Sequence, residues 1–419
     1  MRRAPAALQI YRGLATLASP LARPWLAARA RDGKEDRQRL GERLGRPSEQ
    51  RPHGPLVWLH GASVGESLAI LPLAQRFREL RPDLAVLLTT GTRTAAGLVA
   101  ERLPLGAVHQ YIPLDTPRAA KRFIDFWRPD LAVFVESELW PILIGTARRS
   151  GARMALVSAR LSEGSARRWS LAPASARWLF AALDCILARD AAQAERLHRL
   201  GARIDGIWDA KRGAAPLPGD PIALAVLEAS LGGRPMVLAA STHLGEEGPI
   251  LAAFAKVAPP ESLLVLAPRH PARANEIADL ARAAGLSLAR RSRSEDVGEA
   301  RVYLADTLGE LGLFYRLALA TVIGGSLVPG NGGHNPLEAA RLGCPFAAGP
   351  YVQQWPIYIE FAAGRGCLRL DQANALAAFF AAGLAGELAP MGRRAAKLAA
   401  RLDAETMAVA PRLLQLLDR

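Results

Sequence analysis

Cysteine is nearly absent from the chain, with three residues in 419. Cys185, Cys344 and Cys367 show none of the short spacings of a metal site, and an odd number cannot all pair within one molecule. A disulfide-stapled fold is therefore excluded, and the composition is typical of a reducing compartment. The second half also lacks an acidic cluster spaced to hold a metal ion, so no metal is expected.

A long uninterrupted apolar run is missing as well. Residues 4–30 are rich in Ala and Leu, but Arg12, Pro20, Arg23 and Pro24 interrupt them, so they predict neither a transmembrane helix nor a signal peptide. The pattern is instead typical of a helix lying in a membrane interface, although a helix packed on the body of the protein shares it. The apolar positions at helical spacing are Ile10, Leu14, Leu17 and Leu21.

Negative charge is scarce relative to positive charge, and the formal net charge is +14. Residues 1–51 hold 12 Lys and Arg against 5 Asp and Glu, so half of the excess lies there. This concentration predicts contact with an anionic surface, either phospholipid or nucleic acid. Aromatic residues do not cluster among the basic ones as base stacking requires, which disfavours nucleic acid.

Apolar strand-length runs alternate with helix-length segments, first within residues 56–188 and again within residues 236–348. This alternation predicts an α/β protein with two parallel sheets, each covered by helices on both faces. Gly and Pro break the rhythm around residues 209–220. We therefore expect a membrane-associating and basic segment at 1–50, a Rossmann-like domain at 51–208, a linker at 209–220, and a second Rossmann-like domain with terminal helices at 221–419, the two domains facing each other across a cleft.

The stretch LVWLHGASVGES, residues 56–67, predicts a strand, a glycine turn and a helix start. Gly61 and Gly65 let backbone amides approach a ligand closely. Glu66 opens the helix, where a carboxylate can act as a general base or merely complement the helix dipole. Residues 61–65 also match G-x-S-x-G, the turn that presents a nucleophilic serine, here Ser63, in hydrolases. The missing G-K-[ST] argues against a phosphate loop.

Polar side chains follow other predicted strands. Glu136 and Glu138 follow the strand at 131–135, and Arg160 follows the next strand. The carboxyl ends of parallel strands gather ligand-binding groups, and an acidic pair there is costly without a role, although helix capping also accounts for such residues. In the second domain the corresponding groups are Ser241, Thr242, Glu246, Arg269 and His270.

The stretch GGSLVPGNGGHNPLE, residues 324–338, is the strongest signal in the chain. Its glycines, among them Gly324, Gly325, Gly332 and Gly333, cost conformational entropy on folding and so are not there for stability. Asn335 begins a helix whose amides suit a phosphate or carboxylate, and Glu338 can accept hydrogen bonds from ribose hydroxyls. The pattern predicts a nucleotide site in the second domain.

Several blocks together resemble the 3-deoxy-D-manno-octulosonic acid (Kdo) transferase family, in the family's order and over nearly the whole chain. They are WLHGASVGE at 58–66, ESELWP at 136–141, SARLS at 158–162, STHLGEE at 241–247, PRHP at 268–271, IGGSL at 323–327 and GGHNPLEAA at 332–340. The sequence departs from the family's pattern at residues 206–209, which read GIWD in place of GNLK, and at Gln354-Trp355 in place of Asn-Phe.

The resemblance implies an inverting glycosyltransferase of GT-B fold that moves Kdo from CMP-Kdo to a lipid A precursor, lipid IVA, at the cytoplasmic face of the inner membrane, with no cofactor. Glu66 matches the family's general base, and the block Glu136 to Glu138 matches a second acidic motif needed for activity. The positions that match the donor-nucleotide side are Arg269, His270, Gly325, Asn335 and Glu338. The other residues expected to line the substrates are Ser63, Gly65, Arg160, Ser241, Thr242, Glu246, Gly324, Gly332, Gly333 and His334.

Two other enzymes remain as alternatives. One is a GT-B relative that uses another activated sugar acid. The other is an α/β-hydrolase with Ser63 as nucleophile, which needs a later acid and histidine, for which Glu136 and His243 are candidates. A non-enzymatic membrane or nucleic-acid binder leaves the glycine-rich loop at 324–338 unexplained.

Overall fold

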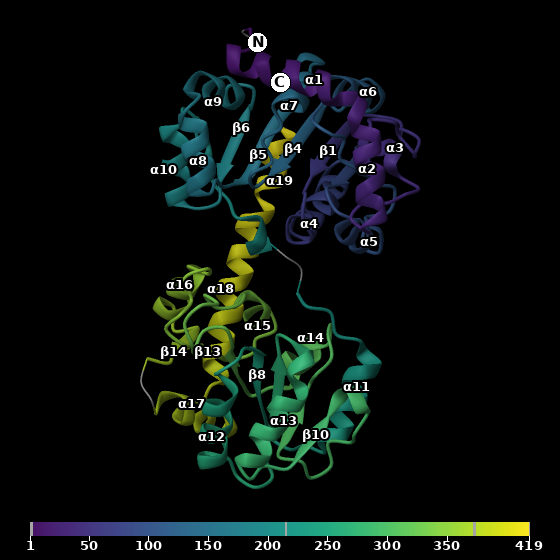
Figure 1. Cartoon of the computed structure of the whole chain (residues 1–419). Coiled ribbons are helices and arrows are strands. Elements are labelled where there is room, and N and C mark those ends of the chain that lie inside the picture. The colour runs from purple at the N-terminus through teal and green to yellow at the C-terminus, as the bar shows by residue number, and fades with distance from the viewer. Residues whose placement is uncertain (1–2, 214–215, 372–373, 419) are drawn as a thin grey trace. The chain divides into compact units, whose positions relative to one another are not determined.

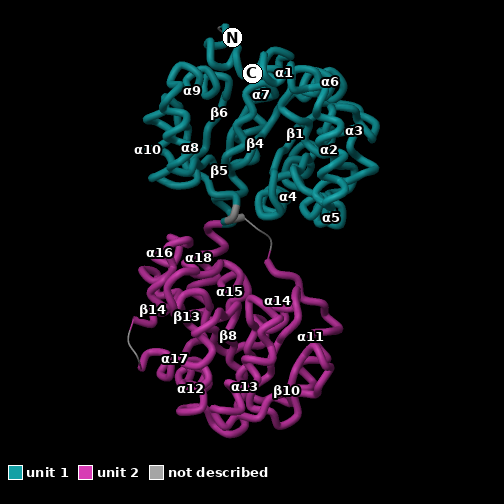
Figure 2. The backbone as a smooth tube through the Cα atoms, viewed as in Figure 1, with its two compact units in different colours: residues 1–214, 403–419 teal, residues 215–402 magenta. Residues whose placement is uncertain are grey.

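The structure is a computed structural model that describes residues 3–213, 216–371 and 374–418. The chain divides into two compact units, residues 1–214 with 403–419 and residues 215–402 (Figure 2). In each unit, helices flank a parallel sheet (Figure 1).

The sheet of the first unit is buried on both faces. Every residue of β1, β2 and β4 is buried, as strands covered by helices on both sides require. The strand order is β3-β2-β1-β4-β5-β6-β7, and β1 pairs in parallel with β2 on one side and β4 on the other. The topological switch point therefore lies between β1 and β4. The strands are β1 (Leu56–His60), β2 (Ala85–Thr90), β3 (Val108–Tyr111), β4 (Leu131–Val135), β5 (Arg153–Ala159), β6 (Cys185–Ala188) and β7 (Gly206–Ile207).

Several helices of the first unit begin at a side-chain cap that follows a strand. Ser63, Thr92 and Thr116 each accept a hydrogen bond from the backbone N–H three residues later, which fixes where α4, α5 and α6 start. The helices of this unit are α1 (Ala6–Ala18), η1 (Ser19–Leu21), α2 (Ala22–Arg31), α3 (Leu40–Arg43), α4 (Val64–Leu80), α5 (Arg93–Ala100), α6 (Pro117–Trp127), α7 (Pro141–Arg149), α8 (Glu163–Ser170), α9 (Pro173–Phe180), α10 (Ala191–Arg199), η2 (Ala210–Gly213) and α19 (Val409–Leu414).

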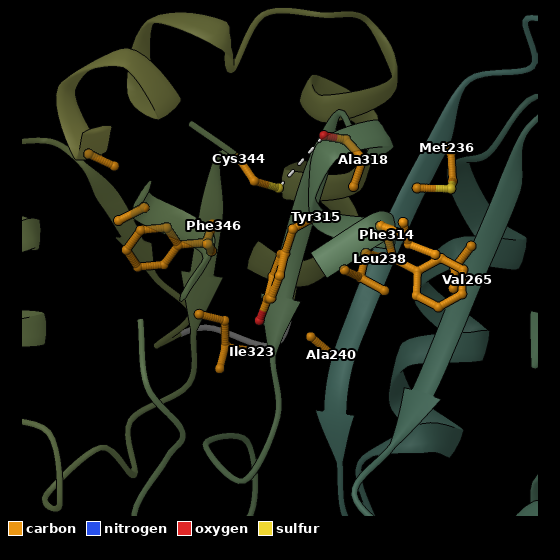
Figure 3. Packing of buried hydrophobic residues seen from close by; sticks show 14 of the residues in the cluster. Met236, Leu238, Ala240, Val265, Phe314, Tyr315, Ala318, Ile323, Cys344 and Phe346 are labelled. Carbon is orange, nitrogen blue, oxygen red and sulfur yellow. Dashed lines mark hydrogen bonds between the residues drawn. The ribbon is translucent and has the colours of Figure 1, made fainter. Parts of the chain in front are cut away.

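The second unit repeats the parallel design with the order β10-β11-β9-β8-β12-β13-β14. β8 pairs with β9 on one side and β12 on the other, so its switch point lies between β8 and β12. Phe314 and Tyr315 of α14 pack on the sheet among Leu238, Val265 and Ile323 (Figure 3). The strands are β8 (Met236–Thr242), β9 (Leu263–Pro268), β10 (Leu288–Arg290), β11 (Val302–Leu304), β12 (Ala320–Ile323), β13 (Phe346–Ala348) and β14 (Cys367–Arg369).

The helices of the second unit cover this sheet. They are α11 (Pro221–Leu231), α12 (Glu247–Val257), η3 (Pro271–Arg273), α13 (Ala274–Ala283), η4 (Arg291–Arg293), α14 (Leu311–Leu317), α15 (Leu337–Arg341), α16 (Ile357–Ala363), α17 (Ala375–Leu384) and the first part of α18 (Ala389–Met407). No single described helix has the length and hydropathy to cross a membrane. One bent pair, residues 375–384 with 389–414, passes that test together by length and composition.

The end of the chain corrects the expected range of the second domain, 221–419. Residues 403–419 belong to the first unit. The apolar side of α19 joins the same buried cluster as β1 and α4, through Val409, Ala410, Leu413 and Leu414. An amphipathic pattern shows that a helix packs on a core but does not say which core, so the sequence could not place this helix.

Trp208, which belongs to the departure from the family pattern at residues 206–209, has a structural role. It follows the edge strand β7, is only 6% exposed, and donates its indole N–H to the carbonyl of Thr406 at 3.2 Å. The returning end of the chain is therefore held to the first unit by a buried aromatic residue and a hydrogen bond.

We expect Trp208→Ala to lower the free energy of unfolding of the first unit by about 3–5 kcal/mol, the usual cost of removing a buried tryptophan. Trp208→Phe should cost less, because it keeps most of the buried area. Urea unfolding followed by circular dichroism measures both, and a loss below about 1 kcal/mol for the alanine variant would contradict this account of the returning segment.

Candidate active site

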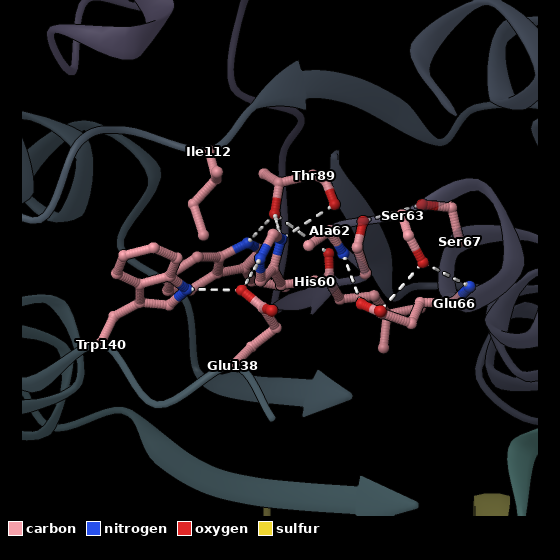
Figure 4. A network of polar contacts seen from close by, with 12 residues as sticks. His60, Ala62, Ser63, Glu66, Ser67, Thr89, Ile112, Glu138 and Trp140 are labelled. Atoms are coloured by element: carbon pink, nitrogen blue, oxygen red, sulfur yellow. Dashed lines mark hydrogen bonds and ion pairs between the residues drawn. The ribbon is translucent and has the colours of Figure 1, made fainter. Parts of the chain in front are cut away.

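The turn after β1 holds Glu66 beside the switch point of the first sheet. A Cβ on Gly61 would lie 2.8 Å from the backbone nitrogen of Ser67, so the turn requires glycine there. Ser63 Oγ accepts the N–H of Glu66 at 3.3 Å and donates its hydroxyl hydrogen to Glu66 Oε1 at 2.9 Å. Glu66 Oε2 accepts the N–H of Ala62 at 2.9 Å (Figure 4). The carboxylate is thus held at the start of α4.

Ser63 is the N-cap of α4, and Glu66, three residues later, keeps capacity for a further hydrogen bond. An ionised carboxylate has about four lone-pair sites, and the two contacts to Ser63 and Ala62 leave others open. Glu66 is partly exposed, and a Cβ built on the neighbouring Gly65 meets nothing within 4 Å. The structure thus places a carboxylate of fixed position next to open space, as a general base requires.

In the described part of the chain, Ser63 has no histidine placed to activate it. Its hydroxyl donates to Glu66, whereas the nearby His60 directs Nδ1 to Thr89 and Nε2 to Glu138. Among the described residues no histidine bonds to Ser63, so the pair that a serine hydrolase needs does not form here.

Glu138 and His60 connect β4 to β1 across the switch point. The imidazole Nε2 lies 3.3 Å from Glu138 Oε2, which also accepts the indole N–H of Trp140 at 2.7 Å (Figure 4). Burial raises the pKa of Glu138, but the contacts with His60 and Trp140 outweigh burial and lower the pKa overall. Sequence reasoning did not name His60 as a site residue, although a histidine that ends an apolar strand and precedes glycine was a usable signal.

Glu136 and Arg160 form an ion pair at the ends of β4 and β5. Arg160 Nε lies 2.5 Å from Glu136 Oε2, and the Glu136 side chain is only 3% exposed. Glu136 has φ 58° and Ser158 has φ 52°, a left-handed conformation that is strained for residues other than glycine. The structure therefore brings the two predicted residues together, with backbone strain at both strand ends.

Asp115 is a buried residue that the sequence analysis missed. Its Oδ1 accepts the N–H of Leu143 at 2.7 Å, and its Oδ2 accepts the N–H of Ile142 at 3.2 Å and the hydroxyl of Tyr11 at 2.9 Å. These bonds cap α7, because the side chain of its own N-cap residue, Trp140, makes no capping hydrogen bond. By capping α7, Asp115 also fixes the position of the segment just before this helix, which contains Glu138 and Trp140. No local sequence pattern pairs Asp115 with α7, because helix α6 and strand β4 lie between them in the chain.

Residues at the end of β8 and β12 meet at the switch point of the second sheet. Ser241 has φ 55°, and the register of β8 against β9 shifts at this point. Thr242 is fully buried, and its hydroxyl has no hydrogen-bond partner among the residues that the structure describes. A Cβ on Gly324 would lie 2.5 Å from the carbonyl oxygen of Ser241. Only glycine therefore lets the segment after β12 lie this close to the end of β8. Gly325, Gly332 and Gly333 all have positive φ, which fits the expectation of a glycine-dependent loop.

The structure corrects the substrate-binding role that the sequence predicted for Glu246. It is 0% exposed, so it does not face a substrate as the sequence suggested. Its Oε2 accepts the N–H groups of His243 and Gly325, and its Oε1 accepts those of Ser326 and Leu327, at distances from 2.8 to 3.0 Å. The carboxylate holds the glycine-rich loop to the β8 loop. The sequence could not show this, because all but one of these donors lie about 80 residues away.

Three histidines and an arginine gather near this loop. His243 Nε2 lies 2.8 Å from His334 Nε2, and the His243 ring packs edge-on against His270. Burial first, and then the neighbouring His243, Arg269 and His270, lower the pKa of His334 to about 4. Such a group of donors suits an anion. No set of three or more His, Cys, Asp or Glu side chains among the described residues is placed to hold a metal ion.

Asn335 and Glu338 lie at the helix that follows the glycine-rich loop. Asn335 Oδ1 accepts the N–H of Leu337, but α15 is only five residues long. Burial raises the pKa of Glu338, opposed by a hydrogen bond with Asn335 and by Arg269. A cavity of about 110 Å³ opens nearby, and its lining includes Ser241, Arg269 and Phe314.

Comparison with known proteins identifies the family. The profile described as 3-Deoxy-D-manno-octulosonic-acid transferase (kdotransferase) matches residues 38–210. A probable mitochondrial 3-deoxy-D-manno-octulosonic acid transferase of Arabidopsis thaliana is 35% identical over 82% of this chain and 80% of its own length. The 3-deoxy-D-manno-octulosonic acid transferase of Bordetella pertussis is 35% identical over 81% and 83%. The chain belongs to the Kdo transferase family.

Membership in the Kdo transferase family makes the protein a glycosyltransferase and confirms the resemblance noted in the sequence. A glycosyltransferase of Rickettsia africae ESF-5 has the same fold, with a TM-score of 0.58 over 87% of this chain and 98% of that chain at 10% identity. Anabaena Alr3699/HepE in complex with UDP and glucose gives a TM-score of 0.54 over 86% and 100% at 14% identity. The predicted GT-B fold class is confirmed.

We expect Glu246→Gln to lower the free energy of unfolding of the second unit by about 2–4 kcal/mol, because an NH₂ group would face buried N–H donors that need an acceptor. The control Glu228→Gln, at an exposed position of α11, should leave stability unchanged. Thermal unfolding of both variants checks this, and a stable Glu246→Gln protein with a raised KM would restore the substrate role that the sequence suggested.

The low pKa of His334 gives a pH prediction. Its imidazole ordinarily titrates near 6.5, so between about 6.5 and 4 the unfolded chain binds a proton that the folded chain does not. The free energy of unfolding of the second unit should therefore fall as the pH is lowered through this window, and His334→Asn should lessen the fall. Urea unfolding at several pH values measures the slope, and equal slopes for both proteins would contradict the assignment.

Proposed function

We propose that the protein transfers Kdo from CMP-Kdo to lipid IVA, a lipid A precursor, with inversion at the anomeric carbon and without a metal or cofactor. The reaction would take place at the cytoplasmic face of the inner membrane. The relatives in Arabidopsis thaliana and Bordetella pertussis support Kdo transfer, because about a third of the residues are identical over most of both chains. The observation that carries the mechanism is the fixed, partly exposed Glu66 carboxylate beside the open space at Gly65.

In this mechanism Glu66 accepts the proton of an acceptor sugar hydroxyl as that oxygen bonds to the anomeric carbon of Kdo. The bond from this carbon to the phosphate oxygen of CMP breaks on the opposite face, and CMP leaves with the electron pair. Positive charge develops on the sugar in the transition state, so a nearby ionised carboxylate stabilises it. Glu138 supplies one, because its contacts with His60 and Trp140 lower its pKa.

The second unit would hold the donor. The leaving phosphate carries negative charge, and Arg269 supplies positive charge in this unit. The neighbouring His243 and His334 have lowered pKa values, so they are neutral near pH 7 and offer ring N–H groups as donors. The strained Ser241 and the unpartnered Thr242 hydroxyl lie at the end of β8, where open α/β sheets bind ligands. Proton uptake by the histidines on binding an anion would add to the attraction.

A donor with another activated sugar acid is the second candidate, and one contact favours it. Gln354, which departs from the family pattern, donates its backbone N–H to the carbonyl of Gly332 at 3.1 Å, and its side chain fills the space where a Cβ on Gly332 would lie. The departure therefore alters the wall of the glycine-rich loop. Turnover with CMP-Kdo compared with another CMP-linked sugar acid, read by product mass, separates the two donors.

We expect Glu66→Gln to keep the fold and CMP binding but to lower kcat by about two orders of magnitude or more, because glutamine cannot take the proton. The matched control is Glu163→Gln, which changes an exposed glutamate in the first turn of α8. Transfer is measured with CMP-Kdo and lipid IVA by mass spectrometry of the product. Near-normal transfer by the Glu66→Gln protein would contradict the assignment of Glu66 as the general base.

A further inference from the structure

Trp140 is an aromatic residue of the candidate active site that is exposed to solvent. Of the eight tryptophans in the chain, only Trp25 and Trp140 are exposed, at 50% and 37%. The guanidinium of Arg29 covers the ring of Trp25, 4.9 Å from the ring centroid. Among the described residues, no aromatic ring or cationic group packs on Trp140 in this way. More than a third of the surface of Trp140 is therefore open to a ligand.

The Trp140 ring is held in one place. Its indole N–H donates to Glu138 Oε2 at 2.7 Å (Figure 4). Pro141 follows directly and restricts the backbone of Trp140 to extended conformations, here with φ −98° and ψ 98°. The carbonyl of Trp140 accepts the N–H of Ile144 at 2.9 Å, in the first turn of α7. A ring that is already ordered loses little conformational entropy when a ligand packs on it.

Glu138 adds an open hydrogen-bond acceptor beside this ring. Its Oε2 accepts the indole N–H of Trp140 and lies 3.3 Å from His60 Nε2, so this oxygen has two partners. Within the described part of the chain no donor bonds to Oε1, and the Glu138 side chain is 13% exposed. A carboxylate oxygen accepts up to two hydrogen bonds, so Oε1 can accept hydroxyl hydrogens from a ligand.

An aromatic ring beside a carboxylate has the chemistry of a saccharide site. A sugar ring carries C–H groups on its face and hydroxyl groups around its rim. The C–H hydrogens are weakly positive and suit the negative face of an aromatic ring, whereas the hydroxyl groups need acceptors. A phosphate is disfavoured, because the lowered pKa of Glu138 keeps this carboxylate negative. An acyl chain would cover Oε1 without supplying a donor.

The pair of Trp140 and Glu138 lies at the same edge of the sheet as Glu66. His60, which contacts Glu138, ends β1, and Ala62, whose N–H bonds to Glu66, comes two residues later. The Cα atoms of His60 and Ala62 are therefore at most about 7 Å apart. The anchors of the two carboxylates are thus neighbours, as they must be if one bound sugar contacts the indole and gives a proton to Glu66.

We propose that Trp140 and Glu138, here termed the indole platform, bind the acceptor sugar, with the C–H face of the sugar on the indole and a sugar hydroxyl donating to Glu138 Oε1. The identity of this sugar as the acceptor rests on the proposed function. His60 acts through Glu138 and is a positioning residue of the platform. The contact with the indole is the same in the ground state and the transition state, so it lowers the KM for the acceptor more than it raises kcat.

The first test compares Trp140→Ala with Trp140→Phe in the full chain. Both variants lose the N–H that Glu138 accepts, and only phenylalanine keeps an aromatic face, so the difference between them reports the ring alone. With lipid IVA dispersed in detergent, the KM for lipid IVA should be about 5-fold higher in Trp140→Ala than in Trp140→Phe, with similar kcat values. Equal KM values, or a difference in kcat alone, would overturn the proposal.

The second test needs no turnover. A glucosamine disaccharide without acyl chains should change the tryptophan fluorescence of the unaltered protein, and Trp140→Phe should abolish this change, because phenylalanine does not emit in the same range. The matched control is Trp25→Phe, which replaces the other exposed tryptophan and should keep the change. No change in the unaltered protein, or an equal change in the Trp140→Phe protein, would overturn the proposal.

Thermal unfolding of each variant shows whether it is folded, and Trp140→Leu, which also lacks a ring, replaces Trp140→Ala if that protein does not fold. CMP binding should be the same in all folded variants, and its loss in Trp140→Ala would overturn a role confined to the acceptor. A fluorescence change that requires Trp140, in a protein that does not transfer Kdo, would refute the proposed function alone. Transfer of Kdo with equal KM values in the two Trp140 variants would refute the indole platform alone.

Discussion

A parallel sheet covered on both faces leaves its strand ends as the places where side chains can meet a ligand, and both units depend on this constraint. In the first unit the switch point separates β1 from β4, so Glu66 comes from one side and Glu138 from the other. In the second, β8 and β12 play the same part and bring Ser241 next to Gly324. Each cluster is assembled from segments that the sheet order, and not the sequence order, makes neighbours.

Carboxylates in these clusters differ in function because they differ in hydrogen-bond donors and exposure. Glu246 has four backbone donors and no exposure, so it fastens one loop to another. Asp115 is nearly as buried and caps a helix from outside it. Glu66 has two local donors and an open side, which leaves it able to exchange a proton with a bound hydroxyl. A carboxylate can therefore join two loops, cap a helix or act as a base, depending on its hydrogen-bond donors and its exposure.

The alternation of apolar runs was enough to predict two α/β domains and most of the strands, because central strands of a parallel sheet are apolar throughout. The edge strands β7, β10 and β14 have two or three residues, too few for any periodicity to show. The positions of Glu136 and Arg160 at the ends of neighbouring strands were predicted, but their ion pair was not. The capping role of Asp115 and the loop contacts of Glu246 depend on partners far along the chain. Local pattern predicts which groups reach the edge of a sheet, and only the fold shows which of them face inward.

The return of residues 403–419 to the first unit makes the second unit an insertion within the first. The first unit is thus not a continuous stretch of chain, and its core is complete only after the last helix has been synthesised. A fragment that stops at the linker would lack the side chains of α19 that cover β1 and α4. Two peptide connections, not one, join the units, so any change in their arrangement must be absorbed at both crossings at once.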